Sequence, residues 1–234
     1  MPSGMHRFAL TYKSLCRLKQ QRGTISACSP SHARSFTGPH KITYVSTNDL
    51  VCALFWRAIS RAHKAVNPSD PNTCMMLACD VRQRIGLPLT YTGNLSFPLI
   101  MHSTKDELSS QTLTDTATCI RHRINSISSK FVHETLALMS SEQSMQKLIS
   151  LFDPAHSFFS ASITSGFQMF NVSDFGFGQP SHIDIPAYLT PGFSIWMPAK
   201  SSKTAINVNI SLRNDVFKHM AADSEFTEFV DMIH

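Results

Sequence analysis

The chain has 234 residues, of which 42% are apolar and 16% are charged. This composition predicts one large or two small globular domains with a buried core, and it excludes a disordered chain. The sequence has no apolar run near the roughly 20 residues that a membrane span needs, and its first residues lack the apolar core of a secretion signal. We therefore expect a cytoplasmic protein with no membrane partner.

The net charge of +5 comes entirely from the beginning of the chain. Residues 1–48 hold seven Lys or Arg and no acid, so the remainder has 14 bases against 16 acids, a net charge of −2. Such a segment is typical of a transit peptide, of a contact with a phosphate-bearing partner, or of an irregular solvated stretch. Nucleic-acid binding is disfavoured, because only Phe8 and Tyr12 accompany the basic residues and no recognition motif follows.

The first half of the chain predicts two helices and one buried strand. Residues 8–10 suit a short strand or turn, followed by a basic amphipathic helix that ends near Gly23. Ser46-Thr47-Asn48-Asp49 offers a serine cap with an acid three residues on, before a helix with one broad apolar face. The apolar run Cys74–Cys79 has the length of a buried strand.

The second half predicts further helices and strands. Apolar residues recur at helical spacing over 113–127, and a second helix follows over 131–139. Residues 206–212 alternate between apolar and polar, as in a strand with one wet face. We expect further strands at 163–170 and 193–197 and a capped helix over 214–233. Strands interleaved with helices indicate an α/β fold with a mixed sheet.

The heptapeptide Asp174-Phe175-Gly176-Phe177-Gly178-Gln179-Pro180 packs an acid, two aromatics, two glycines and a proline into one segment. The glycines supply backbone angles that other residues resist, and the proline stops a helix or central strand. The aspartate can cap the turn or pair with a cation. Taken alone, the segment is a rigid, shaped loop or a hairpin connection.

The six cysteines lack CxxC spacing, so we expect no metal site.

Three separated signatures stand in order along the chain. Ser46–Asp49 opens a helix that contains Trp56-Arg57, Asp80-Val81-Arg82 leads to Tyr91-Thr92-Gly93-Asn94, and Asp174–Gly178 follows. Together they resemble the C-terminal half of the BAHD-type acyl-CoA-dependent acyltransferases. The Phe form of the last motif and the closing PAKSSKTAINVNISLRND are similar to the fungal branch that contains trichothecene O-acetyltransferase relatives. This resemblance covers nearly the whole chain.

The resemblance implies a fold and a domain division. The family has a two-domain fold like chloramphenicol acetyltransferase, with a channel between the domains that admits acyl-CoA from one side and an alcohol or amine from the other. This chain resembles the second domain, with a mixed sheet flanked by helices. Residues 1–40 correspond to the basic crossover segment with a short helix, and residues 41–234 to the C-terminal acyltransferase domain. Lys13, Arg17 and Lys19 become candidate contacts to the phosphates of the coenzyme.

The resemblance also assigns roles to the motif residues. In the family, the aspartate of the DFGWG-type motif pairs with the arginine of Asp-x-Arg and shapes the channel, which maps here to Asp174 with Arg82, next to Asp80. Phe177 replaces the more common Trp and keeps an aromatic wall without the indole donor. Gly93-Asn94 matches a turn that lines the channel, although an Asn in a left-handed turn is an equally good structural interpretation.

The catalytic base of the family is the His of an HxxxDG motif in the first domain, which removes a proton from the acceptor. His102 and His219 each begin an HxxxD match, but neither is followed by Gly, and both lie downstream of landmarks that this motif should precede. We interpret both as chance matches. The sequence thus favours an O-acyl (acetyl) transferase of fungal secondary metabolism, present as its C-terminal half and inactive alone. The alternative is a non-catalytic module that binds CoA or pairs with a separate chain carrying the N-terminal domain.

Overall fold

A computed structural model describes residues 3–21, 42–140, 157–186, 190–200 and 204–233 of the chain. No helix in these ranges is both long and apolar enough to cross a membrane. In chain order the elements are β1 (Ser3–Thr11), α1 (Tyr12–Gln20), α3 (Thr47–Val66), β2 (Asn72–Asp80), the 3-10 helix η1 (Gln83–Ile85), β3 (Ser96–Thr104), α4 (Lys105–Ser110), α5 (Leu113–Asn125), α6 (Ser129–Met139), β4 (Ser157–Ile163), α8 (Met169–Val172), β5 (Phe193–Pro198), β6 (Thr204–Arg213), α9 (Asn214–Ala221), α10 (Ser224–Thr227) and β7 (Asp231–Ile233).

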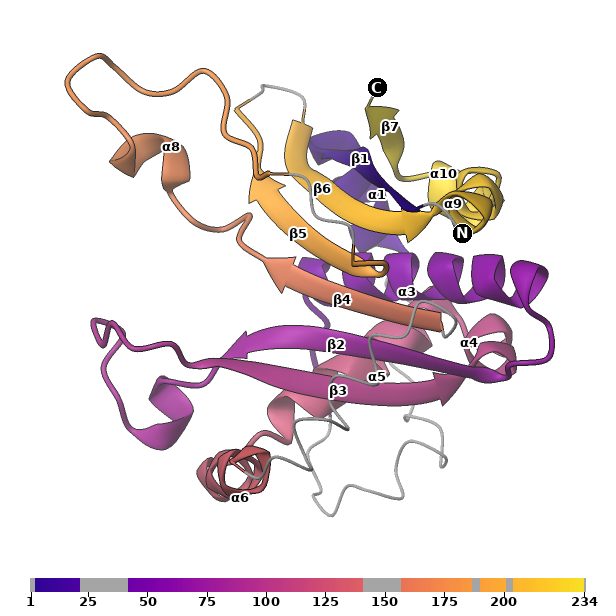
Figure 1. Cartoon of the computed structure of the whole chain (residues 1–234), viewed down its shortest axis with the longest axis horizontal. Helices are drawn as coiled ribbons and strands as arrows, with labels where there is room; N and C mark the ends of the chain where they lie inside the picture. Colours follow the sequence, from indigo (N-terminus) through magenta and orange to yellow (C-terminus); the bar gives the residue numbers. More distant parts are fainter. Residues whose placement is uncertain (1–2, 22–41, 141–156, 187–189, 201–203, 234) are drawn as a thin grey trace.

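The seven strands form one mixed sheet in the order β3-β2-β4-β5-β6-β1-β7. The strands β2, β4 and β5 run parallel to one another, and the other neighbours are antiparallel. Figure 1 shows α3 and α5 on the same side of this sheet. The expected α/β fold with a mixed sheet flanked by helices is therefore confirmed.

The central helix α3 begins where the sequence predicts. Ser46 accepts a hydrogen bond from the amide of Asp49, and the carboxylate of Asp49 accepts one from the amide of Ser46, which completes a capping box. Arg121 of α5 donates to both carboxylate oxygens of Asp49, at 2.8 and 2.9 Å, and to the hydroxyl of Ser46. Because Asp49 is only 2% exposed, this cation balances a buried charge and fixes α5 against the start of α3.

A chain of buried hydroxyls joins α3 to the middle of the sheet. The indole nitrogen of Trp56 donates to the Thr73 hydroxyl at 3.0 Å, and the Ser60 hydroxyl lies 2.8 Å from the same oxygen. Thr73 on β2 also lies 2.9 Å from the hydroxyl of Ser157 on β4. All four side chains are buried, so these bonds satisfy groups that water cannot reach.

Two arginines of α3 hold the short helices α4 and α10. The buried Arg57 donates to the carbonyls of Leu108 and Gln111 and to the carboxylate of Glu225. Arg61 donates to both carboxylate oxygens of Asp223, the residue that caps α10. Long-range polar contacts therefore fix α4 and α10 on α3, although both helices are too short to be stable alone.

Several sequence predictions need correction. The strand expected at 163–170 lies earlier, as β4 (Ser157–Ile163), and residues 169–172 form the short helix α8. The capped helix expected over 214–233 is divided into α9, α10 and the edge strand β7. Within the segment 1–40, residues 3–11 pair with β6 and β7 and so belong to the sheet. Its role as a crossover segment stays a prediction, and its residues 22–40 lie outside the described residues.

We predict that Thr73→Val lowers the free energy of unfolding by about 1–3 kcal/mol, because the variant keeps the shape of Thr73 but leaves buried partners unsatisfied. Chemical denaturation measures the change. Thr90→Val, at an exposed position, is the matched control and should stay within about 0.5 kcal/mol of the wild type. Equal stabilities for both variants would contradict a structural role for the hydroxyl cluster.

We predict a pH dependence of stability from His63 on α3. Burial, together with the nearby cations of Lys105 and Arg213, lowers the pKa of His63 from 6.5 to about 4. The folded state therefore prefers the neutral ring. The stabilisation that comes from this preference is fully present above pH 6.5, and it is lost as the pH falls toward about 4 because the unfolded chain then binds the proton more readily. The His63→Gln variant should lose less stability than the wild type over this window. The free energy of unfolding of both proteins, measured at several pH values in this window, tests the prediction. An equal loss of stability in the two proteins would contradict it.

Candidate functional site

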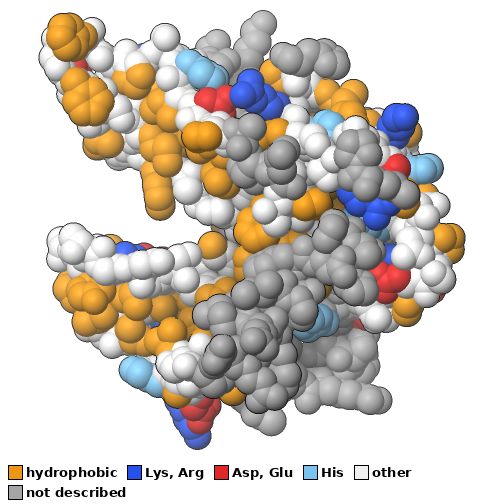
Figure 2. All heavy atoms as spheres, in the orientation of Figure 1, with side chains coloured by type: hydrophobic (Ala, Val, Ile, Leu, Met, Phe, Trp, Pro, Cys, Tyr) orange, Lys and Arg blue, Asp and Glu red, His pale blue; other side chains and the backbone are white. Residues whose placement is uncertain are grey.

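A cleft opens where two parallel strands separate. The strands β2 and β4 pair from Thr73↔Ser157 to Leu77↔Ala161, and no further pair follows. Figure 2 shows the resulting cleft as an open space between two parts of the surface. We call residues 78–96, which include η1, the lower arm, and residues 162–180, which include α8, the upper arm. Ligands of α/β proteins commonly bind at the carboxyl ends of parallel strands, which is the place that this cleft occupies.

Arg82 holds the loop of the lower arm together. Its guanidinium donates to the carbonyl of Tyr91 at 2.9 Å and to that of Gly93 at 2.8 Å, and it contacts the Asp80 carboxylate at 3.0 Å. The amide of Arg82 also donates to Asp80, and this hydrogen bond is the main cause that lowers the pKa of the Asp80 carboxyl. These contacts hold the two ends of the loop that follows β2 together.

Gly93 and Asn94 shape the end of the lower arm. A Cβ at Gly93 would lie 2.3 Å from the ring of Tyr91, so a larger residue would displace that ring. The side-chain oxygen of Asn94 accepts a hydrogen bond from the amide of Ser96 at 3.1 Å, where β3 begins. In this structure Asn94 makes a turn contact, and a role in lining a channel stays a prediction.

The upper arm contains the motif Asp174–Gly178. One carboxylate oxygen of Asp174 accepts hydrogen bonds from the amides of Gly176 at 2.8 Å and Gly178 at 3.1 Å. Both glycines have positive φ angles, +94° and +91°, which residues with a side chain rarely adopt. The aspartate therefore organises a tight loop around its own carboxylate, as the sequence suggested for a capping acid.

Lys200, which sequence analysis did not single out, secures the other end of this loop. Its ammonium group donates to the carbonyl of Pro180 at 2.7 Å and lies 5.7 Å from the centre of the Phe170 ring. The only signal in the sequence was its place within the closing PAKSSK segment. No local pattern showed that it reaches back 20 residues to the loop.

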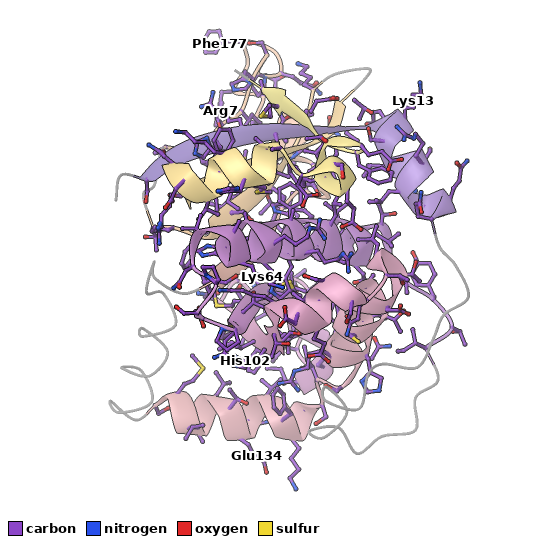
Figure 3. All side chains as sticks on the ribbon, turned by 90° about the vertical axis from the view of Figure 1, so that its right-hand side faces the viewer. Arg7, Lys13, Lys64, His102, Glu134 and Phe177 are labelled. Atoms are coloured by element: carbon purple, nitrogen blue, oxygen red, sulfur yellow. The ribbon has the colours of Figure 1, made fainter. Side chains whose placement is uncertain are left out.

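Large apolar side chains are exposed at the tip of the upper arm. Phe175 is 84% exposed and Phe177 is 99% exposed, and Phe167 and Val172 of the same arm are also exposed. Figure 3 shows Phe177 pointing away from the body of the protein. Figure 2 shows apolar side chains on the upper side of the cleft and mainly polar or backbone atoms on the lower side. An exposed apolar patch of this kind marks a surface for a partner or ligand.

The predicted pair of Arg82 with Asp174 is not formed in this structure. The two residues lie on opposite arms, and each finds its partners within its own arm. The physical reason is the local supply of partners, since carbonyls and Asp80 satisfy the guanidinium and glycine amides satisfy the carboxylate. The sequence motif correctly marked both loops, but it indicated a contact between them that the described residues do not make.

The candidate phosphate contacts lie on α1, which Figure 1 places away from both arms. Arg17 donates to the Glu228 carboxylate at 2.5 Å and lies 5.3 Å from the centre of the Phe229 ring, so its charge is already paired. Lys13 and Lys19 are exposed. A contact of these three residues with a coenzyme stays a prediction, and the structure favours the two lysines over the arginine.

The two HxxxD histidines do not approach their aspartates as an acid–base pair. Asp106, four residues after His102, lies 2.5 Å from Lys64, and Asp223, four residues after His219, is held by Arg61. Burial and the nearby Arg123 lower the pKa of His102. Figure 3 shows His102 far from Phe177. Among the described residues, no three His, Cys, Asp or Glu side chains are grouped as a metal site would require.

Comparison with known sequences defines the family of this fold and cleft. The sequence model of the Transferase family matches residues 24–227. The chain therefore belongs to this family, that of the BAHD-type acyltransferases. It is 26% identical over 195 residues to a trichothecene 3-O-acetyltransferase of Saccharomyces cerevisiae, a match that covers 81% of this chain and 41% of that protein. It is 22% identical to an anthranilate N-benzoyltransferase of Dianthus caryophyllus, over 73% of this chain and 39% of that protein.

Solved structures share the fold. TRI101 of F. graminearum, complexed with coenzyme A and T-2 mycotoxin, matches with a TM-score of 0.75 at 20% identity, over 100% of this chain and 51% of that one. Vinorine synthase matches with a TM-score of 0.73 at 17% identity, over 99% of this chain and 48% of that one. The chain thus spans about half the length of the relatives it matches.

We predict that the two arms respond independently to substitution. Arg82→Lys, which loses the forked contact to two carbonyls, should speed amide hydrogen exchange in residues 82–95 only. Asp174→Ala should speed exchange at Gly176 and Gly178 only. Exchange measured by mass spectrometry or NMR tests this, with Lys130→Ala on α6 as a control that changes neither arm. Faster exchange in the upper arm of Arg82→Lys would instead support a direct pair between Arg82 and Asp174.

Proposed function

We propose that this chain is the second domain of an acyl-CoA-dependent O-acyltransferase of the fungal acetyltransferase kind. One observation carries the proposal: the family signatures Asp80–Arg82, Tyr91–Asn94 and Asp174–Gly178 lie on the two arms that border a single cleft. The family match and the CoA-bound neighbours support acyl-CoA as the cosubstrate. No permanently bound cofactor is part of this proposal.

The proposed reaction transfers an acyl group from the thioester sulfur of acyl-CoA to the oxygen of an alcohol. A base must remove the hydroxyl proton as the new ester bond forms, and the coenzyme leaves as its thiol. Neither arm, residues 78–96 and 162–180, contains a histidine. We therefore assign the base to the histidine of an HxxxDG motif in a first domain, which lies outside this sequence. The chain alone would then be inactive.

The acceptor is proposed only as a class. The neighbouring structures contain T-2 mycotoxin or deoxynivalenol with coenzyme A, which makes an alcohol of fungal secondary metabolism the natural candidate. An amine acceptor is the second possibility, because an N-benzoyltransferase is among the relatives. The cleft described here supplies one side of such a pocket.

The alternative function is a non-catalytic module that binds CoA or pairs with a chain carrying the first domain. The exposed aromatic residues of the upper arm favour pairing, since Phe175 and Phe177 contact little of their own chain. The pairing form of this alternative uses the same surface as the acyltransferase and differs from it in that the assembled pair does not turn over acyl-CoA. A second polypeptide that carries the first domain is the partner proposed where this module pairs with another chain.

We predict that the purified 234-residue chain alone releases no thiol from acetyl-CoA in the presence of an alcohol acceptor. Adding the first domain of the yeast relative should produce acceptor-dependent thiol release, because the histidine base is then supplied. A thiol-reactive dye measures the release. His102→Ala and His219→Ala should leave the restored rate unchanged. Turnover by the chain alone would contradict the assignment of the base, and a mixture that pairs without turnover would favour the non-catalytic function.

A further inference from the structure

The upper arm has no core of its own. None of its residues, 162–180, is buried, and the same holds for residues 181–186 that follow. Figure 1 shows this stretch extending away from the sheet beyond the end of β4. The lower arm differs, because its Val81 is 1% exposed and belongs to the core. A segment without buried side chains gains little from packing, so the position of the upper arm depends on the few contacts that join it to the body of the protein.

Both ends of this stretch are tied to the sheet. At the first end, the amide and the hydroxyl of Thr164 donate to the carbonyl of Trp196 on β5, at 2.9 and 2.7 Å. At the far end, the carboxylate of Asp184 accepts a hydrogen bond from Asn209 on β6 at 3.1 Å and pairs with Arg7 on β1 at 2.6 Å. Arg7 and Asn209 stand opposite each other in the sheet. Asp184 therefore bridges two neighbouring strands and fixes this end.

Between these two ends, Lys200 is the one described side chain that donates a hydrogen bond to the arm from the body of the protein. Its ammonium group donates to the carbonyl of Pro180 at 2.7 Å and lies 5.7 Å from the centre of the Phe170 ring, within the range of a cation–π contact. Phe170 lies on α8, in the limb that leaves the sheet, and Pro180 lies in the limb that returns to it. Lys200 therefore contacts both limbs of the arm.

The returning limb is shaped for this contact. Pro180 fixes its own φ angle, restricts Gln179 to extended backbone and has no N–H. Its carbonyl is thus the only polar backbone group at this position, and Lys200 satisfies it. The side-chain amide of Gln179 donates to Asn171 of α8 at 3.2 Å. The two limbs are thus joined to each other, and Lys200 holds the joined limbs near the end of β5.

We propose that Lys200 is a positioning residue, which holds the upper arm in the place where it borders the cleft. This inference rests on the proposed function, in which the cleft holds the reactants. Lys200 is exposed, and one hydrogen bond at such a site shifts an equilibrium by only about three- to tenfold. The contact can therefore release, and the arm with its motif Asp174–Gly178 then leaves this place. Lys200 acts on the reaction only through Pro180 and Phe170.

A distance across the cleft of the 234-residue chain measures the position of the arm directly. Nitroxide labels are attached through azide-bearing residues at Leu89 of the lower arm and Phe177 of the upper arm, both exposed, so the cysteines are not used. Pulsed EPR should give one narrow distance distribution for the wild type and for Lys200→Arg, which keeps a donor. Lys200→Met keeps the length of the side chain without a donor and should give a broader distribution. Equal distributions for the wild type and Lys200→Met would overturn the proposal.

A kinetic readout separates positioning from a general loss of stability. In the pair formed with the first domain, substrates that bind the held arm draw it back into place, so saturating substrate hides the loss. Lys200→Met should therefore raise the KM for acetyl-CoA about three- to tenfold and leave kcat within about twofold of the wild type. Lys200→Arg should restore the KM.

Lys218→Met, at an exposed lysine on α9, is the matched control and should change neither KM nor kcat. A lower kcat with an unchanged KM in Lys200→Met would mean that fewer molecules are folded, and it would overturn the positioning role.

The outcomes separate this inference from the proposed function. A narrow distribution that Lys200→Met broadens, without turnover by the wild-type pair, supports the role of Lys200 in holding the arm and contradicts the acyltransferase function. Turnover by the wild-type pair, with a distribution that Lys200→Met does not change, overturns the role of Lys200 and leaves the function standing.

Discussion

The Thr73 hydroxyl holds together the three elements from which the cleft begins. It meets Trp56 and Ser60 of α3 and Ser157 of β4 while only 2% exposed. A buried hydroxyl or indole N–H without a partner costs free energy, so these groups satisfy one another only in one arrangement. Sliding or separating the starts of β2 and β4 would leave these buried groups without partners. Both strands are fixed over the central helix at one end, and the cleft opens at the other.

Each arm of the cleft satisfies its own charges. Arg82 is surrounded by acceptors of the lower arm, and Asp174 by amide donors of the upper arm. The contact of Lys200 with Pro180 ties the upper arm to the end of β5 rather than to the lower arm. Since neither arm needs the other for its electrostatic balance, the space between them can remain open. Apolar contacts, by contrast, are left incomplete at Phe175 and Phe177, where a partner surface would be stabilising.

The sequence predicts the elements whose signals are local. The capping box at Ser46 and Asp49 starts α3, and the alternation over 206–212 marks β6, because both depend on neighbours along the chain. The sequence analysis did not locate the start of β4, because the hydroxyl of Ser157 finds its buried partner in Thr73, 84 residues away along the chain. The sequence analysis also did not predict the partners of Arg82. These are backbone carbonyls, which every residue carries and which the identity of a side chain therefore does not reveal.

The sequence motifs that carry the family resemblance have mainly structural roles in this chain. Ser46 and Asp49 anchor α5 through Arg121, Trp56 and Arg57 are buried against their partners, and Arg82 closes a loop. Side chains committed in this way are poorly suited to proton transfer, which needs a titratable group free to face the acceptor. What remains available along the cleft is strand backbone and exposed aromatic surface.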